Sequence, residues 1–250
     1  MSSSRDAKGF PRTNRQVRGA VTVRWLCAAV CTCLTLVLTP RLALAVETSK
    51  QEFGEAVHSK PSVERGAELY RPCAGCHGAT GGGVPNGWVP RIGGQLASVL
   101  QQQLTDYRHN RRWDPRMEAF SDRHHLADAQ AIADVTAYIS QLRPREASGH
   151  GSGESLVHGA ESYANACARC HGGAGEGDAE HGIPGLAAQH YEYLRRQIYD
   201  AVDGRRPNFA QSHVRLLAKL DRDDIGAICD YLSRLGAGEH SPRLGDPITR

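Results

Sequence analysis

A five-residue motif that occurs twice is the feature that most constrains how this chain can fold. The segment 73–77 reads Cys-Ala-Gly-Cys-His, and 94 residues later the segment 167–171 reads Cys-Ala-Arg-Cys-His. An internal repeat of this length predicts two copies of one structural unit.

Further matches at the same offset, or after a shift of one residue, extend the repeat on both sides of the motif. The matched pairs are Tyr70 and Tyr163, Pro90 and Pro184, Gln95 and Gln189, Leu100 and Leu194, Gln103 and Gln197, Leu104 and Ile198, Arg112 and Arg206, Tyr138 and Tyr231, and Leu142 and Leu235. We therefore expect two homologous domains, at residues 61–143 and 154–236.

The hydrophobic pattern of each unit favours helices. In each we expect a short helix that runs into the cysteine motif, a glycine-rich loop, a middle helix, a polar loop and a last amphipathic helix. Ile132, Val135, Ile139 and Leu142 fall on one face of that last helix in the first unit, and the second unit repeats the pattern. No long strand-like alternation occurs, so the predicted fold class is all-α.

The first 45 residues are typical of a signal peptide. They hold seven of the 30 Lys and Arg residues but one of the 27 Asp and Glu residues, followed by the apolar run 25–38 and the triplet Ala-Leu-Ala at 43–45. The 14 apolar residues are fewer than the roughly 20 that span a membrane. We expect cleavage before Val46 and export to the periplasm, with a retained anchor as the alternative.

The predicted mature protein carries 23 basic and 26 acidic residues, a formal net charge of −3. This charge argues against nucleic acid as a partner. Residues 46–60 form an N-terminal segment, and residues 237–250 are expected to be an irregular tail. Residues 144–153, rich in Gly and Ser, are expected to be an exposed and flexible linker.

The Cys-x-x-Cys-His motif is a signature of covalent haem c attachment, with two thiols for the haem vinyl groups and an imidazole for the iron. A disulfide or a thioredoxin-like pair does not need the histidine, and a zinc site needs a second ligand pair much closer in sequence. We predict two covalently bound haem c groups. The predicted residues are Cys73, Cys76 and His77 for the first haem and Cys167, Cys170 and His171 for the second.

The repeat resembles the two-haem class I cytochromes c of bacteria, in particular the cytochrome c-four family, over residues 63–235. The resemblance depends on the paired haem motifs, the Pro-x-(Ile/Leu)-(Gly/Ala)-(Gly/Ala)-Gln segments, the Leu-x-x-Gln-(Leu/Ile) segments and the Tyr-(Ile/Leu)-Ser-x-Leu ends. It implies two cytochrome c folds side by side. It also implies that Pro90 and Pro184 accept hydrogen bonds from the rings of His77 and His171.

The sixth iron ligand is expected to differ between the halves. Met117 stands where the family places its axial methionine, and the second half contains no methionine. A shift of 94 residues places Gln211 opposite Met117, whereas alignment on Leu216 and Leu220 places His213 there. We choose His213 because imidazole is the better iron ligand, and Gln211 stays open as the alternative.

Two further groups of residues are candidates for a role near the haems. His181 and His190 precede or open the middle helix of the second half, on the side expected to carry Pro184. Arg112 and Arg206 are candidates to pair with the haem propionates, and ordinary exposed arginines are the alternative.

The predicted function is electron transfer in a respiratory chain, by a protein that is not an enzyme. A histidine ligand should give the second haem the lower potential, so that electrons enter there and leave from the first. The expected partners are a terminal oxidase or a dehydrogenase, and peripheral membrane association stays open. The alternatives are a haem subunit of a dehydrogenase, such as flavocytochrome c sulfide dehydrogenase, and a haem enzyme with an open second site.

Overall fold

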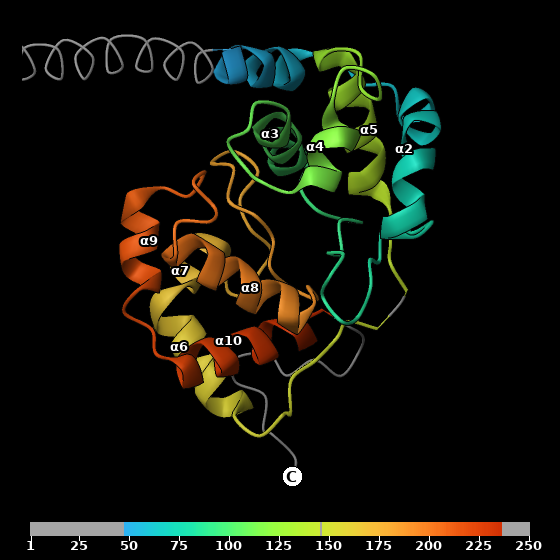
Figure 1. Ribbon diagram of the computed structural model, residues 1–250. Helices are drawn as coiled ribbons and strands as arrows, with labels where there is room; N and C mark the ends of the chain where they lie inside the picture. The colour runs from blue at the N-terminus through green and yellow to red at the C-terminus, as the bar shows by residue number, and fades with distance from the viewer. Residues whose placement is uncertain (1–47, 146, 237–250) are drawn as a thin grey trace, which may run out of the picture. The chain divides into compact units, whose positions relative to one another are not determined.

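The computed structural model describes residues 48–145 and 147–236, and these are helices joined by loops (Figure 1). Within these ranges the extended pairing is one isolated bridge between Asp178 and Ile183, with no longer strand. The predicted all-α fold is confirmed. The predicted signal peptide and the C-terminal tail lie outside the described residues.

The two halves of the repeat contain the same series of helices. In the first half residues 48–58 are helical and are followed by α2 (Val63–His77), α3 (Ala97–Arg108), α4 (Pro115–Ser121) and α5 (Ala129–Gln141). The second half contains α6 (Leu156–Ala166), α7 (Ala168–His171), α8 (Tyr191–Val202), α9 (Gln211–Leu217) and α10 (Arg222–Arg234). The predicted helices are present, but the expected polar loop of each half also contains a short helix, α4 or α9.

Each half has its own hydrophobic core around its last helix. In the first half Ile132, Val135 and Ile139 of α5 are buried together with Tyr70 of α2. In the second half α10 supplies the equivalent face, and Cys229 lies fully buried within it. The apolar stripe predicted from the sequence is therefore the core-facing side of α5.

In each half, the helix that leads into the cysteine motif crosses the last helix at a glycine. A Cβ atom added to Gly66 in α2 would lie 2.1 Å from the carbonyl oxygen of Asp134 in α5. A Cβ atom added to Gly159 in α6 would lie 2.1 Å from the carbonyl oxygen of Ala227 in α10. Because carbon and oxygen atoms cannot approach so closely, this crossing requires glycine in both halves.

We expect Gly66→Ala to lower the free energy of unfolding of the holoprotein by about 1–3 kcal/mol, the usual cost of overpacking a core. Gly54, in the helix 48–58, has no atom within 4 Å of an added Cβ. Gly54→Ala should therefore raise the same quantity by about 0.5–1 kcal/mol. Urea denaturation measures both variants, and equal effects would contradict a close crossing at Gly66.

In the segment that joins the halves, Arg145, Ala147, His150 and Ser152 are exposed, as expected of the linker 144–153. Other residues of this segment bind the second half. The backbone N–H groups of Gly151 and Gly153 donate to the carboxylate of Asp230 in α10, at 2.9 and 2.7 Å. Ser148 is buried. Glycine permits this course because the backbone can approach the carboxylate closely without a side chain.

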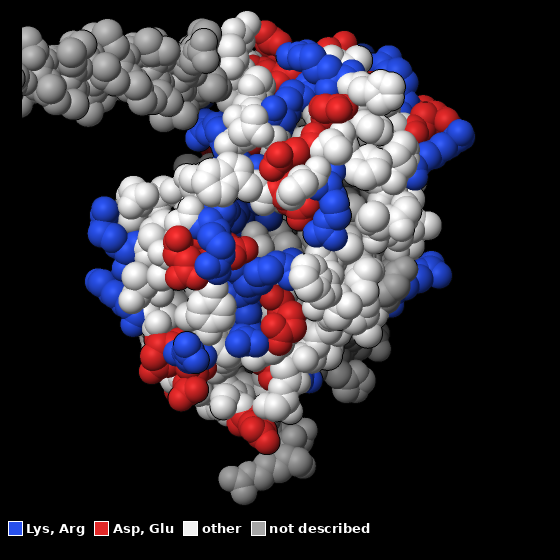
Figure 2. Space-filling model, in the orientation of Figure 1, with Lys and Arg blue, Asp and Glu red and all other residues white. Residues whose placement is uncertain are grey.

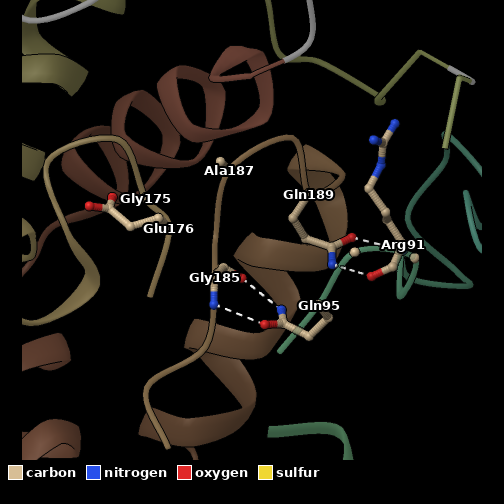
Figure 3. A pocket seen from close by; sticks show the side chains of 9 residues that line it. Arg91, Gln95, Gly175, Glu176, Gly185, Ala187 and Gln189 are labelled. Atoms are coloured by element: carbon tan, nitrogen blue, oxygen red, sulfur yellow. Dashed lines mark hydrogen bonds between the residues drawn. The ribbon is translucent and has the colours of Figure 1, made fainter. Parts of the chain in front are cut away.

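Two glutamines at equivalent positions of the repeat join the halves reciprocally (Figure 3). The amide of Gln95 donates to the carbonyl of Gly185 at 2.9 Å and accepts from its N–H at 3.0 Å. Gln189 makes the same pair of bonds to the backbone of Arg91, at 2.8 and 3.0 Å. These side chains line a cavity of about 140 Å³. Gln95 and Gln189 occupy equivalent positions of the repeat, and each binds the backbone of the half to which it does not belong.

Candidate haem-binding sites

The first predicted haem motif lies in the last turns of α2. The thiols of Cys73 and Cys76 are free, the first partly buried and the second exposed. The ring of His77 is buried, and its Nδ1 donates a hydrogen bond to the carbonyl oxygen of Pro90 at 3.0 Å. A carbonyl can only accept, so Nδ1 carries the proton and the lone pair of Nε2 is available to a metal.

The second motif repeats this geometry at Cys167 and α7. The thiols of Cys167 and Cys170 are free, and Nδ1 of the buried His171 ring donates to the carbonyl oxygen of Pro184 at 3.0 Å. Both contacts between histidine and proline implied by the family resemblance are thus confirmed. A bond of this kind fixes the ring orientation and increases the basicity of a metal-binding imidazole.

Burial determines the protonation of these groups. It lowers the pKa of His77 and of His171, so both imidazoles are neutral at pH 7, the form that binds a metal. Burial also raises the pKa of the Cys167 thiol to about 11 and shifts that of Cys73 in the same direction. Both sites therefore present free thiols and one neutral imidazole, a donor set that fits a covalently attached haem.

Met117 lies in the first turn of α4, the short helix that faces the first motif. Burial has the larger effect on the pKa of His77, but the charge of Arg116 also lowers it and that of Asp114 raises it. Cys76 in turn raises the pKa of Arg116. The start of α4 is thus close to the motif. Met117 is partly buried there.

His213, in α9, is the residue that the structure brings next to the second motif. Its ring centroid lies 6.0 Å from that of His171. The two rings are close enough that both could bind one metal if it is held there. Gln211 and His181 are exposed, and His181 is paired with Asp178.

His190 is not available to a metal because both of its ring nitrogens have partners. Nδ1 accepts from the N–H of Gly149 at 3.1 Å, and Nε2 donates to the carbonyl oxygen of Gly82 at 2.9 Å. The ring is fully buried, and burial lowers its pKa. His190 is therefore a neutral histidine that joins the linker to a loop of the first half.

We expect this neutral histidine to make the protein less stable as the pH falls below about 6.5, the ordinary histidine pKa. The unfolded chain binds a proton there before the folded chain does, so stability present above this pH is lost below it. His190→Gln should reduce the difference in unfolding free energy between pH 7 and pH 5. Urea denaturation at the two pH values measures it.

His181 provides a control of opposite sign, because the hydrogen bond that its ring donates to the carboxylate of Asp178 raises its pKa. Its contribution to stability is present at low pH and lost as the pH rises. His181→Gln should therefore enlarge the loss of stability on acidification, whereas His190→Gln reduces it. The same direction for both variants would contradict these assignments.

Arg112 connects the two halves. It is 7% exposed, so the alternative of an ordinary surface arginine is wrong for this residue. Its guanidinium donates to Gln103 at 2.6 Å in the first half, and to Tyr193 at 2.7 Å and Gln197 at 2.8 Å in the second. The guanidinium carbon of Arg112 lies over the ring of Tyr107, 4.7 Å from the ring centroid.

Arg206, the repeat partner of Arg112, joins the same network. It donates to Gln197 at 2.9 Å and to Gln103 at 3.1 Å. Burial and the charge of Arg112 lower the pKa of Arg206 to about 10, so it is positively charged at pH 7. Among the described residues, the carboxylate of Asp106 reaches this network, through Asn208 at 2.8 Å. The network has an excess of positive charge, and an anion from a bound group fits it.

The charged side chains of the face that shows α8 and α9 are mixed in sign. Figure 2 shows Lys and Arg interspersed with Asp and Glu there, with no large area of one charge. A partner that docks on this face would therefore meet pairs of opposite charges and gain little from long-range attraction.

Comparison with known proteins follows the same repeat. The sequence profile of the family described as Cytochrome c matches this chain twice, at residues 63–143 and 156–236. Cytochrome c4 of Pseudomonas aeruginosa is 30% identical over 187 residues, which cover 71% of this chain and 90% of that protein. The thiosulfate dehydrogenase electron acceptor of Stutzerimonas stutzeri is 30% identical over 174 residues, covering 67% and 80%. The crystal structure of reduced cytochrome c4 from Pseudomonas stutzeri matches with a TM-score of 0.63 and 26% identity, covering 70% of this chain and 100% of that one.

Proposed function

Because the chain belongs to the cytochrome c family, as a two-domain protein of the cytochrome c4 type, we propose that it is a periplasmic electron carrier of a respiratory chain. It carries two covalently bound haem c groups. Haem iron supplies a centre that gains and loses one electron. Within the described residues no helix is long and apolar enough to cross a membrane.

In the first half we assign haem attachment to Cys73 and Cys76 and iron binding to His77 and Met117. The cysteines form thioether bonds through their free thiols. His77 is oriented by the carbonyl of Pro90, at 3.0 Å. Met117 offers a thioether sulfur, a ligand that raises the reduction potential in cytochromes c.

In the second half we assign haem attachment to Cys167 and Cys170 and iron binding to His171 and His213. The observation that supports His213 is the separation of 6.0 Å between its ring and that of His171. Burial lowers the pKa of His213, so its ring is neutral and can bind iron. Replacement of methionine by histidine is expected to lower the potential of the second haem.

The difference in ligands would set the direction of electron transfer between the two haems. With these ligands, the lower potential of the second haem would favour the entry of electrons there and their exit from the first. Haem propionates would balance the excess positive charge of Arg112 and Arg206, whose guanidinium groups bind residues of both halves.

A second candidate is a haem subunit, or electron acceptor, of a dehydrogenase. The relative from Stutzerimonas stutzeri is the electron acceptor of a thiosulfate dehydrogenase. Under this candidate the donor is a dehydrogenase that oxidises a small sulfur compound, and the acceptor is a terminal oxidase. Purification of the tagged chain from its source organism under mild conditions tests this candidate. A dehydrogenase that is purified together with the chain indicates a stable complex, and the chain alone indicates a free carrier.

Electron paramagnetic resonance of the oxidised holoprotein, with haem quantified on the same sample, tests the proposed sites. We expect two haems per chain, both low-spin, one with a histidine–methionine signature and one with a bis-histidine signature. A high-spin signal from one haem in the resting protein would overturn the assignment of His213 and favour an enzyme with an open second site.

A further inference from the structure

The helices that carry the two proposed sixth ligands begin differently. In the first half the carboxylate of Asp114 accepts the backbone N–H of Arg116 at 3.0 Å and of Met117 at 3.4 Å, and Glu118 accepts the N–H of Asp114 at 3.0 Å. In the second half α9 follows Ala210, which offers no side-chain cap. A cap of this kind stabilises a helix by about 1 kcal/mol.

The C-terminal end of α4 and the loop after it are bound by Arg108, which forms a buried ion pair. The second half lacks this pair. Arg108 donates to the carbonyl of Ser121 at 2.7 Å and to that of Leu126, and pairs with Glu52. The side chains of Arg108 and Glu52 are 5% and 6% exposed. The residue 94 positions after Arg108 is Val202, which is 38% exposed and has no side-chain donor.

His213 itself is oriented by stacking and not by a hydrogen bond. Its ring lies on that of Phe209, with centroids 5.1 Å apart and planes inclined by 28°. No side-chain hydrogen bond joins His213 to any of the described residues, whereas His171 donates to Pro184. Loss of such a partner typically lowers metal affinity by about 10–100-fold. His213 is thus the weaker of the two histidines.

We propose that His213 is an exchangeable ligand, and that the second haem site binds a small neutral diatomic molecule in the position that its imidazole vacates. The inference depends on the proposed assignment of His171 and His213 to one iron. In the exchange, the bond between the iron and a ring nitrogen of His213 would be lost, and a bond between the iron and the donor atom of the small molecule would be formed. No electron or proton is transferred. The position takes a ligand no larger than an imidazole ring, and the neighbouring Arg206 disfavours a cation.

Carbon monoxide titration of the dithionite-reduced full-length holoprotein tests this proposal. Absorbance in the Soret region should change with a stoichiometry of one carbon monoxide per chain. The upfield proton signal of the iron-bound methionine methyl group should persist, which shows that the first haem has kept Met117. No binding at saturating carbon monoxide, or loss of the methionine signal at the same concentration, would overturn the proposal.

Two variants examine the cause of the exchange. Phe209→Leu removes the stacked ring and should increase the carbon monoxide affinity of the second site by about tenfold, the low end of the effect of support on metal ligands. Glu52→Gln removes the ion pair from the first half, and should let a second carbon monoxide bind. If Phe209→Leu leaves the carbon monoxide affinity of the second site unchanged, stacking on Phe209 does not control the exchange. This result can be read even if Glu52→Gln does not fold.

The oxidised form of the same preparation separates this proposal from the proposed function. If its paramagnetic resonance spectrum lacks the bis-histidine signature, the assignment of His213 is wrong and the exchange falls with it. If the signature is present and carbon monoxide does not bind, only the exchange is wrong and the electron carrier with a bis-histidine second haem stands.

Discussion

His213→Met should raise the reduction potential of the second haem by on the order of 0.1 V, a part of the roughly 0.8 V range set by axial ligands. The reason is chemical, because a thioether sulfur favours reduced iron more than an imidazole nitrogen does. A spectroelectrochemical titration of the wild-type protein should show two separate one-electron steps. In the variant these steps should move together.

The reciprocal variant is the matched control for this prediction. Met117→His should lower the potential of the first haem by a similar amount and leave the second unchanged. Gln211→Met tests the alternative ligand, because a methionine there should have no effect if His213 binds the iron. A large shift from Gln211→Met together with no shift from His213→Met would assign the site to residue 211.

The repeat was sufficient to predict the fold. Two copies of an attachment motif, and an apolar stripe such as Ile132, Val135 and Ile139, identify paired helical domains because core packing depends on this spacing. The short helices were missed, although Asp114 followed by Pro115 is a typical helix start. In α9 no comparable signal exists, since Ala210 caps nothing.

The contacts of the linker with the second half could not be predicted from its composition. A run of glycine and serine in isolation is flexible, because nothing compensates the conformational entropy of its backbone. Here Asp230 accepts the N–H groups of Gly151 and Gly153, and those partners lie 77 or more residues apart in sequence. A long-range contact of this kind cannot be derived from local sequence.

The candidate sites were predictable where one residue type has one chemical use, and only there. Cys-x-x-Cys-His has few other interpretations, so both motifs were found directly. The choice between Gln211 and His213 depended on an alignment, and the spatial relation of His171 to His213 came from the structure. The buried pair of Glu52 and Arg108 had no sequence signal, because the two residues are 56 positions apart.

Arg112→Met should lower the free energy of unfolding of the holoprotein by about 3–5 kcal/mol, the range for removal of one partner from a buried charge pair. Arg112 and Arg206 share Gln103 and Gln197, with Asp106 as the carboxylate that reaches the network. If haem propionates balance the remaining charge, loss of a guanidinium leaves a buried carboxylate unpaired. Denaturation followed by haem absorbance and by circular dichroism measures the loss.

Arg205→Met is the matched control, because Arg205 is adjacent to Arg206 but 58% exposed and paired with Asp200 at the surface. Removal of such an exposed pair should change stability far less than removal of Arg112. The reduction potentials give an independent result, because a buried positive charge disfavours the oxidised haem, and its removal in Arg112→Met should lower both potentials. If Arg112→Met instead stabilised the protein, repulsion between the two arginines would outweigh their attraction for any carboxylate, and the propionates could not lie between the halves.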